Sequence, residues 1–414
     1  MTELEKTGAA AKSAARVLMC TDTETKNRAL SAMADALVAA REEILAANRE
    51  DLAAGERSGM TRSFLDRLSL TAERIDGMAE GMRQVAALPD PVGRVLSDAA
   101  RPNGLHLTKV AVPIGVIAVI YEARPNVTAD SAALCLKSGN AVILRGGREA
   151  IHSNTAIVRA MRGALRGVGL PEDTVTLIED TDRAVTQALM RLNGYVDLLI
   201  PRGGAGLIRA VVENATVPVI ETGAGTCHIY VDRDADVSMA AEIVFNAKTS
   251  RPSVCNAAEC LLVDRAIAAE ALPVIAARLA EKQVELRADA EACALLPNAL
   301  PATDSDWGRE YNDYIMAVHI VSGVDEAIDF IARYGTGHSE CIVTDNPDTA
   351  ERFLARVDAA AVYHNASTRF TDGGEFGLGA EIGISTQKLH ARGPLGLEEL
   401  TSMKYIVHGT GQVR

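Results

Sequence analysis

The sequence predicts an α/β protein with two doubly wound parallel-sheet domains and a small oligomerisation arm. From Val110 onward, short β-branched runs alternate with alanine-rich helical stretches, the pattern of a parallel sheet covered by helices. A second series of such alternations begins after Asn256. The length of 414 residues is enough for two or three domains of ordinary size. We therefore expect two α/β domains in one chain.

The first hundred residues are predicted to be helical, because apolar residues recur there at helical spacing. The two clearest sets are Leu30, Met33, Ala34 and Leu37, and Ile75, Met78, Ala79 and Met82. The turn sequence RPNG at 101–104 is followed by an imperfectly alternating stretch at 105–112. This pattern predicts a hairpin arm over about 97–112, of a kind that often pairs between subunits.

The strands of the first sheet are predicted at 116–121, 141–144, 175–178, 196–200, 217–220 and 229–231. Those of the second are predicted at 259–263, 315–321, 341–344 and 360–363. A last strand at 404–408 is predicted as an edge strand for oligomer pairing. The expected organisation is a helical segment with the first α/β domain over 1–255, a second domain over 256–365, and a return segment over 366–414.

The amino-acid composition and charge argue against several classes of function and location. The formal charge of −13 argues against a nucleic-acid partner, because phosphate binding needs a basic face. The seven cysteines are odd in number, with no CxxC pair and no metal-ligand spacing, which indicates a reducing, cytoplasmic compartment and no metal. The N-terminus lacks the pattern of a signal peptide, and the longest nearly apolar run, 110–121, is too short to span a bilayer. We expect a cytoplasmic protein.

One cysteine lies in a polar loop where the two domains join. The stretch 249–256 (TSRPSVCN) places Cys255 four residues after Arg251, and a nearby cation lowers a thiol pKa and favours the nucleophilic thiolate. The alternative is that Cys255 is a small buried apolar residue. That second reading is assigned to the cysteines in apolar or alanine-rich surroundings: Cys20, Cys135, Cys227, Cys260, Cys293 and Cys341.

Two polar clusters are candidate ligand sites. Asn126 and Arg124 directly follow the apolar run 116–121, at the strand end where α/β sheets bind ligands. An amide there donates to a developing oxyanion and the arginine adds a cation, although Asn126 could instead cap the next helix. The second cluster offers hydroxyls, an amide and a cation for a carboxylate ligand, or else is a solvated loop. It consists of Asn365, Ser367, Thr368 and Arg369.

Several predicted βα turns contain glycine, at 145–147, 202–204 and 221–225. Glycine lets backbone N–H groups and a helix N-terminus approach a phosphate. The strict GxGxxG fingerprint is absent after the first strand. Taken singly, each of these turns is better explained by tight chain reversal than by phosphate binding.

Three long stretches resemble the gamma-glutamyl phosphate reductase family, a proline-biosynthesis branch of the aldehyde dehydrogenase superfamily. They are 112–126 (VPIGVIAVIYEARPN), 251–256 (RPSVCN), and 365–370 (NASTRF) with 379–386 (GAEIGIST). The resemblance covers essentially the whole chain in order. It implies an aldehyde-dehydrogenase-like fold and NADPH-dependent reduction of L-glutamyl 5-phosphate to L-glutamate 5-semialdehyde and phosphate. It also implies a homodimer or higher homo-oligomer, with glutamate 5-kinase as a candidate partner.

The resemblance also implies residue roles. Cys255 would form a thioester, with the oxyanion held by the Asn126 side chain and the Cys255 backbone N–H. The expected substrate-binding residues are Arg124, Asn365, Ser367, Thr368 and Arg369. The expected cofactor-binding residues are Arg145, Gly203, Gly204 and Glu221.

Three of the expected cofactor-binding positions indicate how the cofactor would be held. Arg145 stands where relatives have a ribose-contacting lysine, and Gly203 and Gly204 form the turn facing the pyrophosphate. Arg145 or Arg148 would pair with a 2′-phosphate, which favours NADPH over NADH. Glu310 is a weaker candidate for a ribose contact.

Two other function classes stay open. Glu221 precedes Cys255 by 34 residues, a spacing similar to the general base of hydrolytic NAD(P)-dependent aldehyde dehydrogenases. A hydrolytic enzyme of that kind would act without phosphate. A non-redox binding or assembly protein with an inert cysteine is the third possibility, and the joint presence of Cys255, Asn126 and the glycine turns argues against it.

Overall fold

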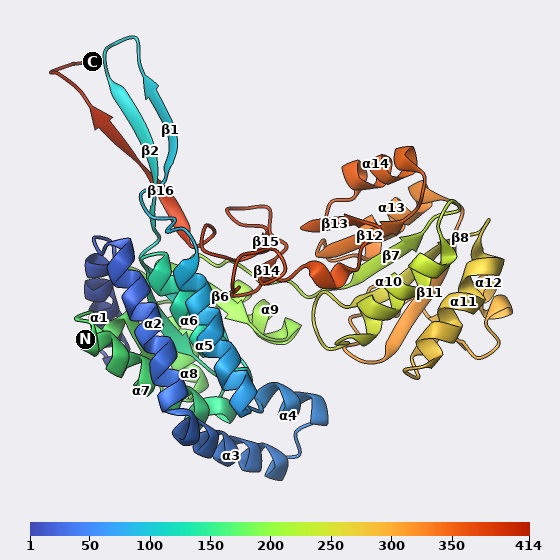
Figure 1. Cartoon of the computed structure of the whole chain (residues 1–414), viewed down its shortest axis with the longest axis horizontal. Helices are drawn as coiled ribbons and strands as arrows, with labels where there is room; N and C mark the ends of the chain where they lie inside the picture. Colours follow the sequence, from blue (N-terminus) through green and yellow to red (C-terminus); the bar gives the residue numbers. More distant parts are fainter. The chain divides into compact units, whose positions relative to one another are not determined.

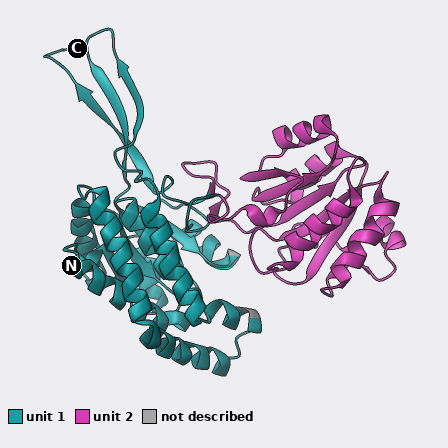
Figure 2. Cartoon of the chain, viewed as in Figure 1, with its two compact units in different colours: residues 1–222, 377–383, 394–414 teal, residues 223–376, 384–393 magenta. Residues whose placement is uncertain are grey.

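The chain divides into two units (Figure 2) in a computed structural model that describes residues 1–414 apart from the side chains of residues 63 and 205. Unit 1 comprises 1–222, 377–383 and 394–414, and unit 2 comprises 223–376 and 384–393. The sequence predicts a boundary near Asn256. The units divide earlier because the strand Cys227–Val231 is hydrogen-bonded within the second sheet.

Unit 1 is rich in helices (Figure 1). They are α1 (Glu3–Leu18), α2 (Thr23–Ala39), α3 (Arg41–Arg57), α4 (Arg62–Leu68), α5 (Ala72–Ala87), α6 (Pro125–Lys137), α7 (Ile151–Gly167), α8 (Arg183–Leu189) and α9 (Ala205–Asn214), with short 3-10 turns at Arg148–Ala150 and Glu172–Thr174. Polar side chains cap several of them; Asp22, for example, accepts a hydrogen bond of 2.7 Å from the Thr25 N–H. Both apolar sets predicted from helical spacing are buried in α2 and α5, which confirms those two helices.

A four-stranded parallel sheet lies in unit 1, in the order β5-β4-β3-β6. Its strands are β3 (Val116–Tyr121), β4 (Ala141–Arg145), β5 (Val175–Leu177) and β6 (Leu198–Arg202). The predicted strand at 217–220 forms only an isolated bridge between Val219 and Leu199. Pro218 has no N–H with which to extend a ladder there. The order reverses at β3, so the carboxyl ends of β3 and β6 form a topological switch point.

A three-stranded antiparallel sheet projects from the helices of unit 1 (Figure 1). It consists of β1 (Val95–Ala100), β2 (His106–Pro113) and the C-terminal strand β16 (Thr401–His408) in the order β1-β2-β16. β16 pairs with β2 from Thr401 opposite Pro113 to His408 opposite His106. The predicted hairpin and terminal strand are both present, and they form one sheet. Their role in subunit pairing stays a prediction.

Unit 2 contains a parallel sheet in the order β10-β9-β11-β8-β7-β12-β13, covered by helices. Its strands are β7 (Cys227–Val231), β8 (Ala258–Asp264), β9 (Glu285–Ala288), β10 (Leu300–Pro301), β11 (Ile315–Val321), β12 (Ser339–Val343) and β13 (Ala361–His364). The helices are α10 (Val237–Thr249), α11 (Ala268–Ala280), α12 (Ala290–Leu295), α13 (Val324–Tyr334) and α14 (Pro347–Arg356), with a 3-10 turn, η3, at Thr368–Phe370. A two-stranded ribbon, β14 (Ile384–Ser385) with β15 (Gly393–Pro394), follows.

Apolar strand residues form the core of each sheet. All six residues of β3 and all seven of β8 are buried, as expected for central strands of parallel sheets. The predicted fold class, α/β with two parallel sheets and a small arm, is therefore confirmed. Among the residues that the structure describes, no helix is long and apolar enough to cross a membrane.

Candidate functional site

Cys255 lies in the loop between α10 and β8, at the amino end of the unit 2 sheet. Its side chain is half-buried, whereas Cys135, Cys227, Cys260 and Cys341 are buried. Cys293 is half-buried and Cys20 is exposed, so these two do not fit the predicted role of buried apolar residues. Exposure and loop position agree with a reactive role for Cys255.

Arg369 spans the two ends of this loop. Its Nε donates to Ser250 Oγ at 3.0 Å, and its Nη1 donates to Asn256 Oδ1. Burial lowers the pKa of Arg369, and the charges of Asp372 and Cys255 oppose that shift, so guanidinium and thiol interact electrostatically. The sequence indicated Arg251 as the cation near the thiol. The structure adds Arg369, from a segment more than one hundred residues away.

Asn256, the residue after the cysteine, is hydrogen-bonded to the turn η3 and to Thr371, which follows that turn. Asn256 Nδ2 donates to the Thr371 carbonyl at 2.9 Å, and the Asn256 carbonyl accepts from Thr368 Oγ1 at 2.7 Å. Asn256 is 3% exposed, so these bonds lie in a mostly dry environment that strengthens them. The loop of Cys255 is consequently fastened to η3 through Asn256.

The four residues predicted to bind a carboxylate are therefore used in different ways. Thr368 and Arg369 contact the Cys255 loop. Asn365 adopts a left-handed conformation and bonds to both the N–H and the carbonyl of Thr344, at 2.9 and 3.0 Å. Ser367 Oγ accepts from the Arg369 N–H at 3.3 Å. Substrate binding by these four residues stays a prediction.

The start of β7 contacts the same loop. A side chain at Gly225 would overlap the Cys255 carbonyl, so glycine is required at this position. The Gly225 N–H donates to Glu310 Oε1 at 3.2 Å. Glu310, predicted as a weak ribose contact, thus holds the segment that packs on the Cys255 peptide.

In unit 1, Asn126 occupies the second position of α6, after Pro125. Its Nδ2 donates to Asp130 Oδ2 at 3.1 Å, one helical turn along, and the cap position belongs to Arg124. The capping alternative for Asn126 is therefore not what the structure shows. An amide has two donor hydrogens, so one remains for an oxyanion. Arg124 is half-buried beside it.

Burial raises the pKa of Asp130 to about 6, from an ordinary value of 3.8; the Asn126 hydrogen bond and the Arg202 charge lower it, and Glu381 raises it. The folded state therefore binds more protons than the unfolded chain between these two values, and stability falls as pH rises through that window. We expect Asp130→Asn to flatten the dependence of unfolding free energy on pH between about 4 and 6. Urea denaturation at several pH values measures it. The exposed Glu213→Gln on α9 is the control; an unchanged slope in Asp130→Asn would contradict the prediction.

A pocket of about 540 Å³ opens at the switch point of the unit 1 sheet. It is lined by Ile120, Tyr121, Glu122, Arg145, Gly146, Gly147, Arg148, Glu149, Thr181, Arg183, Thr186, Gln187, Met190, Gly206, Leu207, Ala210 and Asn214. Its volume lies in the range of small-molecule sites. The position at strand carboxyl ends is where doubly wound folds bind nucleotides. Arg183 was missed in the sequence, although Asp182 is a recognisable helix cap directly before it.

The arginines around this pocket differ in how far their side chains are exposed. Arg145 is 6% exposed and donates to the carbonyls of Gly146 and Asp182, and burial lowers its pKa. Arg148 and Arg183 line the pocket with exposed side chains. They are better placed than Arg145 to meet a ligand phosphate.

The remaining cofactor predictions concern Gly203, Gly204 and Glu221. The Gly204 N–H donates to Glu122 Oε2 at 2.9 Å, so a carboxylate already occupies the amino end of α9 where a pyrophosphate was expected. Glu221 is half-buried and precedes Thr222, whose hydroxyl donates to the Pro201 carbonyl at 2.7 Å. The roles of all three residues stay predictions. Within the described residues, no group of three or more His, Cys, Asp and Glu side chains is placed to hold a metal ion.

Comparison with known proteins gives the family. Residues 1–296 match the sequence profile of the Aldehyde dehydrogenase family. The gamma-glutamyl phosphate reductase of Moorella thermoacetica is 59% identical over 412 residues, covering 100% of this chain and 99% of that protein. That of Clostridium botulinum is 57% identical over 414 residues, covering 100% of both.

Solved structures agree. The gamma-glutamyl phosphate reductase of Thermotoga maritima is 50% identical, with a TM-score of 0.96 and 100% coverage of both chains. An acetylating aldehyde dehydrogenase from Geobacillus thermoglucosidasius, 18% identical, shares the fold with a TM-score of 0.72, covering 100% of this chain and 97% of that one. The chain therefore belongs to the gamma-glutamyl phosphate reductases of the aldehyde dehydrogenase family.

Proposed function

We propose that this protein reduces L-glutamyl 5-phosphate to L-glutamate 5-semialdehyde and phosphate, with NADPH as reductant, in proline biosynthesis. The observation that carries the proposal is full-length identity of 50% or more to gamma-glutamyl phosphate reductases, in a chain whose half-buried Cys255 lies in a loop that the Arg369 guanidinium binds at Ser250 and Asn256. The name of those relatives supplies the substrate. The loop geometry is what a thiolate nucleophile needs.

The proposed chemistry has two steps at Cys255. The thiolate attacks the acyl-phosphate carbonyl carbon, the C–O bond to phosphate breaks, and phosphate leaves with that electron pair, which forms a thioester. Reduction of the thioester carbon is followed by cleavage of the C–S bond, which releases the aldehyde and restores the thiolate. Arg369 stabilises the negative sulfur in both thiolate states. Asn126, with one amide hydrogen held by Asp130, is the proposed oxyanion donor.

The pocket in unit 1 fits an NADP cofactor, which when bound supplies the hydride. Two exposed arginines, Arg148 and Arg183, line it at the strand ends. A 2′-phosphate binds well to a planar guanidinium, whereas NADH offers only a hydroxyl at that position. These two side chains support a preference for NADPH.

We expect Arg183→Ala to raise KM for NADPH by about tenfold or more, because a charge-assisted hydrogen bond contributes about 1.5–3 kcal/mol. KM for NADH should change little. Steady-state kinetics with both cofactors measures the effect. Arg209→Ala, an exposed arginine of α9 outside the pocket lining, is the control, and equal effects on both cofactors would contradict the assignment.

We also propose a homo-oligomer built on the three-stranded arm. β1 and β16 form the two edges of this sheet, and exposed apolar side chains line them: Val95, Leu96, Met403, Tyr405 and Val407. An exposed, partly apolar edge strand is a template for pairing with a second chain. Light scattering that gives a monomer mass would refute this. We further propose a cytoplasmic location and glutamate 5-kinase as a partner.

The function is tested in the reverse direction. NADP⁺ reduction with glutamate 5-semialdehyde at alkaline pH is expected to require inorganic phosphate, which must re-form the acyl phosphate from the thioester. Turnover without phosphate would instead support the hydrolytic alternative, with Glu221 activating water. If no turnover occurs with or without phosphate, both the reductase function and the hydrolytic alternative are refuted.

A further inference from the structure

Cys227, the first residue of β7, contacts the peptide of the proposed nucleophile. It is fully buried, and its Sγ donates to the Cys255 carbonyl oxygen at 3.2 Å. Two residues earlier, Gly225 packs so closely on the same carbonyl that no side chain fits there. The Cys255 carbonyl is thus held between two neighbouring points of one chain segment.

A chain of buried polar side chains continues behind Cys227. His338 Nδ1 lies 3.8 Å from Cys227 Sγ and 2.8 Å from Ser339 Oγ. Ser339 Oγ is 2.7 Å from Thr371 Oγ1, which is also 2.7 Å from the Tyr363 hydroxyl. Thr371 closes the path, because its carbonyl accepts from Asn256 Nδ2. The chain therefore starts at the Cys255 carbonyl and returns to the next residue of the same loop.

The charge state of Cys227 suits a donor. Burial, followed by the charge of Glu340 and the Cys255 thiol, raises the pKa of the Cys227 thiol well above its ordinary value. The group therefore keeps its proton at pH values where a catalytic thiolate forms. A buried cysteine that served only to fill space would have no need of this polar surrounding.

We propose that Cys227 is a positioning residue: its S–H holds the Cys255 carbonyl and so orients the Cys255 peptide that presents the nucleophile. This inference rests on the proposed function, since it assigns Cys255 as the nucleophile. The effect reaches the reaction through the Cys255 backbone, because Cys227 itself is buried. Serine at 227 retains the donor, whereas alanine removes it.

The chain offers a matched control. Cys341 is also fully buried and lies on β12, the strand beside β7, where it pairs with Ile229. It packs in the apolar core cluster of the sheet. Cys341→Ala therefore removes a thiol of equal size and burial from the same sheet, away from the Cys255 carbonyl.

The experiment compares Cys227→Ala, Cys227→Ser and Cys341→Ala in the full-length protein. We expect Cys227→Ala to lower kcat about three- to tenfold with KM unchanged, the size of one net hydrogen bond. The pH profile of iodoacetamide alkylation at Cys255, followed by mass spectrometry of its peptide, should shift as well. Cys227→Ser should keep kcat and the pH profile of alkylation close to those of the protein without substitutions. Cys341→Ala should do the same.

Equal behaviour of Cys227→Ala and Cys341→Ala in the alkylation profile would overturn the inference. So would Cys227→Ser behaving like Cys227→Ala. Alkylation needs neither substrate nor cofactor, so it tests the contact even if phosphate-dependent turnover is absent. If the proposed function is wrong, the protein without substitutions will not turn over glutamate 5-semialdehyde, and that result is observed separately from alkylation. Thermal denaturation of each variant identifies any that do not fold.

Discussion

Replacement of Cys255 by alanine is expected to lower kcat for phosphate-dependent NADP⁺ reduction by at least about 10³-fold, the scale on which loss of a covalent nucleophile acts. The reason is that no other group can form the acyl intermediate at that position. Cys255→Ser should also be nearly inactive, because an alkoxide forms far less readily than a thiolate and an ester accepts hydride poorly. Protein folding should be retained, since the side chain is only half-buried.

The measurement is steady-state turnover at saturating glutamate 5-semialdehyde, phosphate and NADP⁺. Cys20→Ala, which removes the exposed thiol in unit 1, is the control and should retain full activity. A second check is intact-protein mass after incubation with the aldehyde and NADP⁺ without phosphate, where only a chain with Cys255 should gain an acyl adduct. Activity of Cys255→Ala within tenfold of the unmodified protein would refute the nucleophile assignment.

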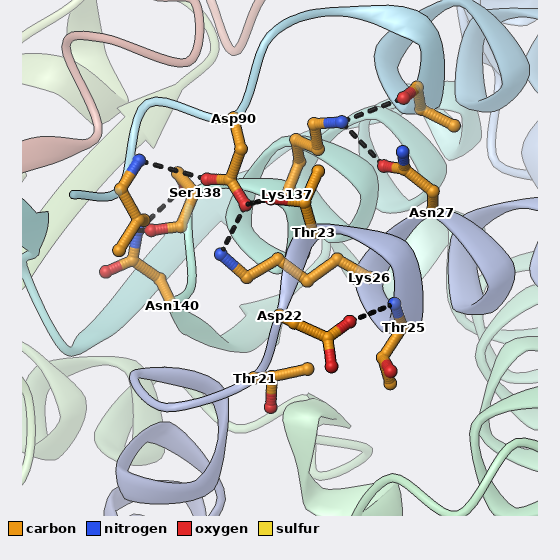
Figure 3. A network of polar contacts seen from close by, with 12 residues as sticks. Thr21, Asp22, Thr23, Thr25, Lys26, Asn27, Asp90, Lys137, Ser138 and Asn140 are labelled. Carbon is orange, nitrogen blue, oxygen red and sulfur yellow. Dashed lines mark hydrogen bonds and ion pairs between the residues drawn. The ribbon is translucent and has the colours of Figure 1, made fainter. Parts of the chain in front are cut away.

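The second large effect concerns stability and a buried ion pair in unit 1 (Figure 3). Lys26 Nζ lies 2.9 Å from Asp90 Oδ2, with the lysine side chain 0% and the aspartate 9% exposed. Asp90 also accepts from Thr23 Oγ1 and the Val92 N–H, each at 2.9 Å. We expect Lys26→Met to lower the free energy of unfolding by about 3–5 kcal/mol, because the carboxylate then stays buried without its counter-ion.

Urea denaturation followed by circular dichroism measures this loss. Arg28→Met is the matched control on the same helix, because Arg28 pairs with Glu24 in an exposed ion pair that contributes little. The double variant Lys26→Met/Asp90→Asn should recover part of the loss, since the Asp90 carboxylate is then no longer buried without the Lys26 cation. Equal stability of Lys26→Met and Arg28→Met would show that the buried pair is not an important contribution.

Local pattern was sufficient for most elements. The apolar spacing at Leu30 to Leu37 predicts α2, and β-branched runs predict the central strands β3, β4 and β8, because burial on both faces leaves a signature in consecutive residues. The short strands β9 and β10 were missed, because only one of the four β9 residues is buried, both β10 residues are exposed, and neither strand has much apolar pattern. Assignment of β7 to the first sheet was also wrong, because strand pairing is not a local property.

The candidate site likewise has features that the sequence predicts and features that only the structure shows. Residue type and loop position in the sequence are enough to single out Cys255, and the order of three motifs is enough for the family. The contacts that Arg369 and Cys227 make with this loop could not be found that way, because each of these residues lies 28 or more residues from its partner in the loop. Arg145 is predicted from the sequence as a cofactor-binding residue, yet its guanidinium is buried against backbone carbonyls.

The sequence by itself thus determined the fold class, the two-sheet organisation and the arm, and it indicated Cys255 as the candidate nucleophile. These follow from periodicity and residue type, which are local. Only the tertiary structure decided which sheet includes β7, which arginines line the pocket, and which side chains hold the Cys255 peptide. Those depend on contacts between distant segments, whose hydrogen bonds and burial exist only once the chain has folded.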